Sequence, residues 1–303
     1  MSTPHNLENW RDRDWLVNYL AEELLMGRLC LFLGAGVSKD SGLPDWKSLV
    51  NNICDEIGEE RLKDQEDPTA KIAGIKLRNF KKESDKESFL AATHKALYDG
   101  FNADFVHLRT CELLSAVAAI TIAATSIYSP KIITLNYDNL LELYLEYYGC
   151  LVSSIYDERH WATGSDVTIY HPHGFLPFSP EEKKSDEIVF EHDDYMKILE
   201  GKYWKPLLQT TLRTHTTIYI GMSGDDLHVK VLLNSMKELH AIENERIKKH
   251  GVFIKRGVSL KLSDEEAILD NTGLQIHKVK AYSDIPEFLF AVSQQARKLK
   301  LQN

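Results

Sequence analysis

The chain has 303 residues, of which 43% are hydrophobic and 27% are charged, and its formal net charge is −9 with a pI near 5.8. This length suits one large domain with a sizeable buried core. The acidic balance argues against broad electrostatic binding of nucleic acid or of an anionic membrane surface. We therefore expect a globular protein that binds neither nucleic acid nor a membrane directly.

The cysteines and the N-terminus indicate the compartment. No two of the four cysteines form a Cys-x-x-Cys pair, so we expect no sequence-local zinc site. The first residues, MSTPHNLENWRDRDW, are polar and charged, unlike a secretory signal. The apolar run 113–127 is too short and too rich in threonine to span a bilayer. These features favour a reduced, cytoplasmic protein without a metal.

The first predicted elements are a helix, a strand and a second helix. Residues 14–27 have the spacing of an amphipathic helix, and RLCLFL at 28–33 is a continuous apolar run. Such a run is typical of a parallel strand that is covered on both faces. Apolar residues then recur at helical spacing from Trp46 to Ile57, with Asp45 placed as the N-cap. A glycine-rich loop joins this strand to this helix.

The rest of the chain alternates between helices and strands. Residues 58–86 are charged and are expected to form a solvated loop with short helices. The other predicted helices cover 87–98, 105–127, 140–148, 227–241 and 284–300, and the other predicted strands cover 131–135, 167–171, 216–220, 251–254 and 274–279. This alternation predicts an α/β protein with a Rossmann-like parallel sheet, helices on both faces and a helical insert. We interpret 55–128 as that insert, a small subdomain within one domain over 1–303.

Polar, glycine-marked loops follow four of the predicted strands. They are GAGVS at 34–38, NYD at 136–138, PHG at 172–174 and GMSGDD at 221–226. In an open parallel sheet, ligands bind beyond the carboxyl ends of the strands. Glycines let the backbone approach a pyrophosphate closely, and backbone N–H groups hold the anion. Together the loops predict a binding site for an anionic cofactor or substrate.

Each loop also has a simpler interpretation. The GAG sequence could be a turn that needs small residues, and Asn136 could cap the helix that follows it. His173 could be a buried structural histidine, and GMSGDD could be a helix entry capped by Asp226. All four loops are expected at the same edge of the sheet. This shared position favours a common binding site over four independent structural roles.

The sequences GAGVSKDSGLPDW, TLNYDNL, HPHG and GMSGDD resemble the signatures of the sirtuin superfamily and follow them in order, over about residues 30–230. The chain lacks the two cysteine pairs of the zinc module in sirtuin deacylases, and it has no recognisable groove for an acyl-lysine peptide. The family's Phe-Arg is replaced by Trp46-Lys47. The chain therefore looks like the zinc-free, sirtuin-like branch of bacterial anti-phage effectors, which hydrolyse NAD.

This resemblance implies roles for individual residues. His173 would be the general base, Asn136 would orient the ribose and the water, and Asp138 would contact the nicotinamide carboxamide or lend negative charge near the developing cation. His171 is the rival base, because it would share a face with His173 if the strand continued. The other predicted NAD-binding residues are Gly34, Ala35, Gly36, Ser38, Gly221 and Ser223 around the diphosphate, with Asp45 and Trp46 beside the nicotinamide.

The function that the resemblance implies is an NAD glycohydrolase that releases nicotinamide and ADP-ribose and depletes NAD during phage infection. NAD would be the substrate, and no metal would be needed. Two alternatives are an NAD or ADP-ribose sensor without turnover and a zinc-free protein deacylase. Because an uncontrolled NAD hydrolase would kill its host, we expect control by homo-oligomerisation or by a separately encoded partner, such as a motor ATPase, an Argonaute-like protein or a phage protein. Tyr144, Tyr147 and Tyr148 could serve such an interface or simply pack their helix onto the sheet.

Overall fold

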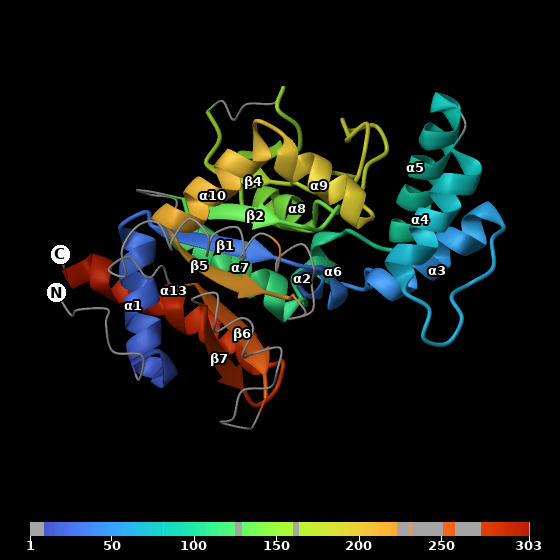
Figure 1. The fold of residues 1–303 in the computed structure, drawn as a ribbon. Coiled ribbons are helices and arrows are strands. Elements are labelled where there is room, and N and C mark those ends of the chain that lie inside the picture. The colour runs from blue at the N-terminus through green and yellow to red at the C-terminus, as the bar shows by residue number, and fades with distance from the viewer. Residues whose placement is uncertain are drawn as a thin grey trace.

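A computed structural model describes residues 9–80, 82–124, 129–159, 164–222, 231, 251–257 and 274–302. The described strands form one seven-stranded sheet in the order β3-β4-β2-β1-β5-β6-β7, and all neighbouring pairs are parallel (Figure 1). The strands are β1 (Leu29–Leu33), β2 (Lys131–Thr134), β3 (Val152–Ile155), β4 (Val167–Tyr170), β5 (Thr216–Ile220), β6 (Val252–Arg256) and β7 (Gln275–Val279). The predicted α/β, Rossmann-like sheet is confirmed.

The strand order places a switch point at the centre of the sheet. Strands β2, β4 and β3 lie on one side of β1. Strands β5, β6 and β7, which come later in the chain, lie on its other side. The strands that follow β1 and β5 along the chain, β2 and β6, therefore lie on opposite sides of this central pair. In sheets of this kind a crevice opens there, and it is the usual ligand site.

Side chains of the central strand alternate between two hydrophobic cores. Leu31 and Leu33 of β1 belong to one core, and Cys30 and Phe32 belong to the other, as the two-residue period of a strand requires. The first core is covered by α1 (Arg13–Leu25), α7 (Glu112–Ala124), α8 (Leu140–Tyr147) and α13 (Asp284–Gln302), and the second by α9 (His192–Glu200) and α10 (Trp204–Thr214). Helices therefore cover both faces of the sheet (Figure 1).

A third group of helices stands beyond the carboxyl ends of the central strands (Figure 1). It consists of α3 (Trp46–Ile57), α4 (Pro68–Asn79) and α5 (Glu83–Tyr98), and α3 packs against both others. Asp45 caps α3 as predicted, because its carboxylate accepts a hydrogen bond from the N–H of Ser48 at 3.0 Å. By contrast, α7 packs against α13 on the sheet. The division into a domain over 1–303 and an insert over 55–128 stays a prediction, and α7 lies within that range.

Some predicted elements differ from the observed ones. The helix expected over 105–127 is split into α6 (Phe105–Leu108) and α7, whereas the short helices expected within 58–86 include α4. The strand β3 was not predicted, because its VSSI sequence lies half-exposed at the sheet edge and lacks an apolar run. Neither α9 nor α10 was predicted, and the helix expected at 227–241 lies almost entirely outside the described residues.

Two further expectations concern surfaces. Tyr144 is buried, whereas Tyr147 and Tyr148 are about half exposed, at 51% and 53%. The packing interpretation is therefore correct for Tyr144 and leaves the other two rings on the surface.

Among the described helices, none combines the length and the apolar character that a membrane crossing demands.

Candidate active site at the switch point

The glycines of the first loop allow two loops to touch across the switch point. The N–H of Gly34 donates to the carbonyl of Ile220 at 2.9 Å, and the N–H of Gly36 donates to the carbonyl of Gly221 at 2.8 Å. A Cβ on Gly36 would lie 2.7 Å from the Cα of Gly221. Gly221 itself has a φ of +70°, and its own Cβ would lie 2.6 Å from the nitrogen of Val37. These N–H groups bond within the protein, so the glycines here serve the close contact of two loops.

Asn136 binds the first loop through its side chain. Its Nδ2 donates to the carbonyl of Gly34 at 3.2 Å and to Oγ of Ser38 at 3.0 Å. Because a carbonyl can only accept, the amide nitrogen must face Gly34, and Oδ1 remains as an acceptor. The following helix, α8, begins at Leu140 with Asn139 as its cap. Asn136 is therefore not the helix cap that the simpler interpretation suggested.

Ser38 connects Asn136 to a buried carboxylate. The Ser38 hydroxyl accepts from Asn136 and donates to Oδ1 of Asp138 at 2.9 Å, and the N–H of Leu140 donates to the same oxygen at 3.2 Å. Burial raises the pKa of Asp138 to about 6, although these two hydrogen bonds oppose the rise. Asp138 is therefore a carboxylate whose charge changes near neutral pH.

His173 is placed by a turn and by a segment from far along the chain. The N–H of Gly174 donates back to the carbonyl of His171 at 3.0 Å, and Gly174 has a φ of +98°. The N–H of Val189 donates to the carbonyl of His173 at 2.9 Å. The His173 side chain is mostly buried, at 6% exposure, and its ring lies 5.5 Å from that of Tyr195. The turn and the returning segment thus fix this histidine at the sheet edge.

A cavity of about 550 Å³ joins these groups, a size within the roughly 300–1,000 Å³ typical of small-molecule sites. The predicted site residues that line it are Gly34, Ala35, Ser38, Trp46, Asn136, Asp138, His173 and Gly221. Helices α3, α4 and α5 close its outer side, where the indole N–H of Trp46 donates to Oγ1 of Thr69 at 3.2 Å. The cavity therefore lies between the sheet edge and the third group of helices.

Other predicted site residues lie elsewhere. Gly36 contacts Gly221 behind the cavity wall. The carboxylate of Asp45 caps α3 and pairs with Lys39 at 2.9 Å, which lowers the pKa of Asp45 to about 2. It does not line the cavity. Ser223 lies outside the described residues.

His171 is separated from the cavity, although it is only two residues from His173. It has no exposed surface, and it does not line the cavity. The predicted shared face depended on the strand continuing, but β4 ends at Tyr170 and a turn follows. The structure therefore brings His173, and not His171, to the cavity.

Residues that the sequence did not single out also line the cavity. They include Thr69, Tyr137, Val189, Phe190 and His192. The one available signal was the apolar sequence Ile188-Val189-Phe190 after a strongly charged stretch. Nothing in the sequence alone indicated that this segment returns to pair with His173.

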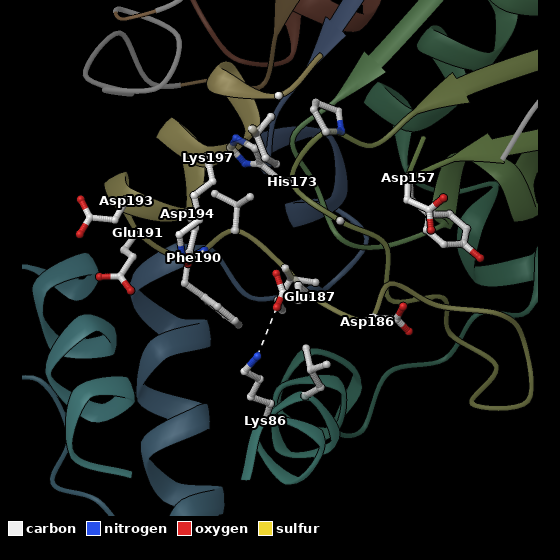
Figure 2. A pocket seen from close by; sticks show the side chains of 18 of the residues that line it. Lys86, Asp157, His173, Asp186, Glu187, Phe190, Glu191, Asp193, Asp194 and Lys197 are labelled. Carbon is white, nitrogen blue, oxygen red and sulfur yellow. Dashed lines mark hydrogen bonds and ion pairs between the residues drawn. The ribbon is translucent and has the colours of Figure 1, made fainter. Parts of the chain in front are cut away.

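A second cavity of about 740 Å³, drawn in Figure 2, shares His173, Val189 and Phe190 with the first. Two of the acidic side chains that line it, Glu187 and Asp194, form ion pairs with lysines. Lys86 pairs with Glu187 at 3.3 Å, and Lys76 pairs with Asp194 at 2.6 Å. These pairs tie α4 and α5 to the segment that carries Val189 and Phe190. Within the described residues, no three His, Cys, Asp or Glu side chains gather as a metal ion would require.

The fold and the site define a Rossmann-like α/β protein with a polar cavity at its topological switch point. Residues 130–277 match the family model of the SIR2-like domain, to which this part of the chain is similar. It is 25% identical over 279 residues, 90% of its length, to defense-associated sirtuin 2 of Bacillus subtilis. It is 23% identical over 264 residues, 86% of its length, to the NAD(+) hydrolase ThsA of Enterococcus faecium.

The chain spans only part of these relatives. It covers 25% of the length of the Bacillus subtilis protein and 50% of that of the Enterococcus faecium protein. An uncharacterized protein of Sinorhizobium fredii is 25% identical over 233 residues, which is 72% of this chain and 18% of that relative. The similarity therefore concerns one portion of longer proteins.

Proposed function

We propose that this protein is an NAD glycohydrolase that cleaves NAD to nicotinamide and ADP-ribose. The observation that carries the proposal is the convergence of Asn136, Asp138 and His173 on one cavity at the switch point. The similarity to a protein named NAD(+) hydrolase agrees with it. The proposed enzyme class, an NAD-using hydrolase, rests on these two observations together.

The reaction makes limited chemical demands. The nicotinamide of NAD is a cationic pyridinium, so it leaves as a neutral molecule and needs no general acid. The site must stabilise positive charge that develops on the ribose and must deliver water to C1′. The carboxylate of Asp138, the amide oxygen of Asn136 and the imidazole of His173, which all line the cavity, meet these demands.

Two residues would act on the ribose and the developing charge. Asn136 uses both amide hydrogens on Gly34 and Ser38, so its Oδ1 is the atom that accepts a hydrogen bond from a ribose hydroxyl or from the attacking water. Asp138, when ionised, supplies negative charge that favours the oxocarbenium-like transition state. Ser38 fixes both groups relative to each other through two hydrogen bonds.

His173 would act as the general base. The bond between C1′ and the pyridinium nitrogen breaks, the water oxygen bonds to C1′, and the water proton passes to the imidazole before release to solvent. An imidazole can take up and release a proton near neutral pH, which suits this role. The products are nicotinamide and ADP-ribose, and atoms and charge balance.

The biological role and the assembly are part of the same proposal. A role in anti-phage defence agrees with the name of the defense-associated sirtuin that the chain resembles. We propose a cytoplasmic, homo-oligomeric enzyme whose activity awaits a trigger, with a separately encoded motor ATPase, Argonaute-like protein or phage protein as the candidate activator. The aromatic surface around Tyr147 and Tyr148 is a candidate interface.

Incubation with NAD tests the function. The protein is incubated with NAD alone, with each candidate partner and with an acetyl-lysine peptide, and the products are separated by chromatography. Nicotinamide with ADP-ribose supports the glycohydrolase, and acetyl-ADP-ribose that forms only with peptide indicates the deacylase. Calorimetric binding of NAD without any product indicates the sensor. Absence of NAD binding under every assembly condition contradicts the proposal.

A further inference from the structure

A second polar group lies directly beneath the proposed active site. His171 has no exposed surface and Glu142 of α8 is only 4% exposed. The His171 ring contacts two partners: Nε2 lies 2.6 Å from Oε1 of Glu142, and Nδ1 lies 3.2 Å from the backbone carbonyl of Asn136. The hydroxyl of Ser154 donates to the same Glu142 oxygen at 3.0 Å. The pair is thus enclosed, and it touches the backbone of a proposed site residue.

The partners fix where the protons are. A backbone carbonyl only accepts, so Nδ1 must carry hydrogen to bond Asn136. A 2.6 Å contact between Nε2 and the Glu142 carboxyl requires one further proton between these atoms. The pair therefore holds two protons and has no net charge, whichever partner carries the second proton. A neutral pair is the form that burial tolerates, because a lone buried charge would be strongly destabilising.

Asn136 is held from several directions by these contacts. Its own N–H donates to Oγ1 of Thr134 at 3.1 Å, and its carbonyl accepts from His171. Its side chain then reaches Gly34 and Ser38 at 3.2 Å and 3.0 Å. Fixing the backbone on both sides leaves the side chain little freedom to rotate away from the cavity. An error of ~1 Å in such a group can cost ~10²-fold in rate.

We infer that His171 and Glu142 are positioning residues, which share a proton and fix the backbone of Asn136 so that its amide oxygen faces the ribose. This inference rests on the proposed function, because the reaction in question is NAD cleavage. Neither residue touches the cavity. We expect their effect on catalysis to pass through the backbone of Asn136.

Three variants separate positioning from simple stability. His171→Phe keeps a ring beside Phe175 but removes the donor to Asn136. The double variant His171→Phe/Glu142→Leu also removes the buried carboxylate, and replacing both members of a buried pair by apolar groups is often nearly neutral for stability. Glu142→Gln retains the bonds, because its amide donates to Nε2 of a neutral His171 whose Nδ1 still donates to Asn136.

His277→Phe is a matched control. His277 is also buried, and its ring lies 4.7 Å from that of Phe288, the same distance that separates His171 from Phe175. It lies on β7, away from the cavity. If the loss of any buried histidine lowered kcat, His277→Phe would lower it as much as His171→Phe.

Kinetics and crystal structures of these variants test the inference. For His171→Phe and the double variant we expect kcat to fall roughly 10- to 100-fold, with KM within about threefold of wild type. For Glu142→Gln and His277→Phe we expect kcat within about threefold of wild type. In crystals of the double variant, the Asn136 amide should leave Gly34 and Ser38.

The two proposals fail in different ways. If wild-type protein binds NAD but never cleaves it, the proposed function fails, and the crystal structures still decide the positioning role. An Asn136 amide that stays on Gly34 and Ser38 in the double variant overturns the inference. So does a kcat of that variant within about threefold of an active wild type.

Discussion

His171 and His173 are separated by a single proline, yet they lie in different environments. His173 lines the cavity and packs near Tyr195 of α9. His171 is sealed below it and bonds Glu142 of α8, which covers the opposite face of the sheet. The strand ends before both of them, so the turn at Gly174 decides which side chain reaches the ligand. The comparison shows that backbone geometry, and not residue type, decides which histidine reaches the cavity.

The largest expected effect separates the two histidines directly. His173→Ala removes the proposed base, and we expect kcat to fall by ~10³-fold or more while NAD still binds, because general base catalysis supplies ~10²–10⁴-fold. The assay is nicotinamide release, with NAD affinity measured by calorimetry. His277→Ala, a buried histidine outside the cavity, is the control. A His173→Ala variant with near-wild-type turnover would remove the base assignment.

The next effect concerns Asn136, whose carbonyl bonds His171 and which lines the same cavity as His173. Asn136→Ala should lower kcat by at least ~10²-fold, because the ribose and the water lose the amide that orients them. Asn52→Ala is the control, since Asn52 also donates from a half-buried side chain, to the carbonyl of Ala96, but on α3 away from the site. Equal kinetic effects of the two substitutions would mean that Asn136 has only a structural role.

A smaller effect is expected at the residue between Asn136 and Asp138. Ser38→Ala removes one hydrogen bond from each, and we expect kcat to fall about tenfold, the kinetic equivalent of the ~1–1.5 kcal/mol that a hydrogen bond contributes. Ser115→Ala, which loses a hydrogen bond to Tyr144 at 2.9 Å in the helical layer, should leave kcat unchanged. An unchanged kcat for Ser38→Ala would show that the hydrogen bonds of Ser38 to Asn136 and Asp138 do not contribute to the reaction.

The last expected effect is on stability and not on the rate of the reaction, and it depends on pH. The pKa of Asp138 rises from 3.8 to about 6 on folding, so the folded state binds this proton more tightly and stability declines as pH rises from about 4 to 6. Asp138→Asn removes that cost while it retains an acceptor for Ser38. We expect the variant to be more stable than wild type by about 3 kcal/mol at pH 8 and by much less at pH 4.5. Urea unfolding at both values gives the difference. A gain of equal size at both pH values would contradict the raised pKa.

Much of the fold and part of the site could be predicted from the sequence. Strand β1 is a continuous apolar run, β2 and β5 are short and rich in isoleucine, and glycines or polar residues follow all three. The edge strand β3 could not be predicted in this way, because one of its faces is not fully covered and its sequence shows no run. An apolar run in the sequence indicates a buried strand, and an edge strand such as β3 is only partly buried.

The site was harder to predict where distant segments meet. The sequence indicated Asn136, Asp138 and His173, but the roles of the glycines depend on the contact between Gly36 and Gly221, which no local pattern contains. Similarly, Val189 reaches His173 through a backbone hydrogen bond across an irregular segment. Asp45 satisfied a local rule, helix capping, and its bond to Lys39 directs it away from the cavity.

The most direct measurement of the central claim is a crystal structure of the His173→Ala variant soaked with NAD. The account predicts an intact NAD molecule in the 550 Å³ cavity, with its nicotinamide ribose beside the Oδ1 of Asn136 and the carboxylate of Asp138. NAD bound only in the second cavity beside Glu187, or a cavity that stays without NAD when calorimetry shows saturation, would contradict it.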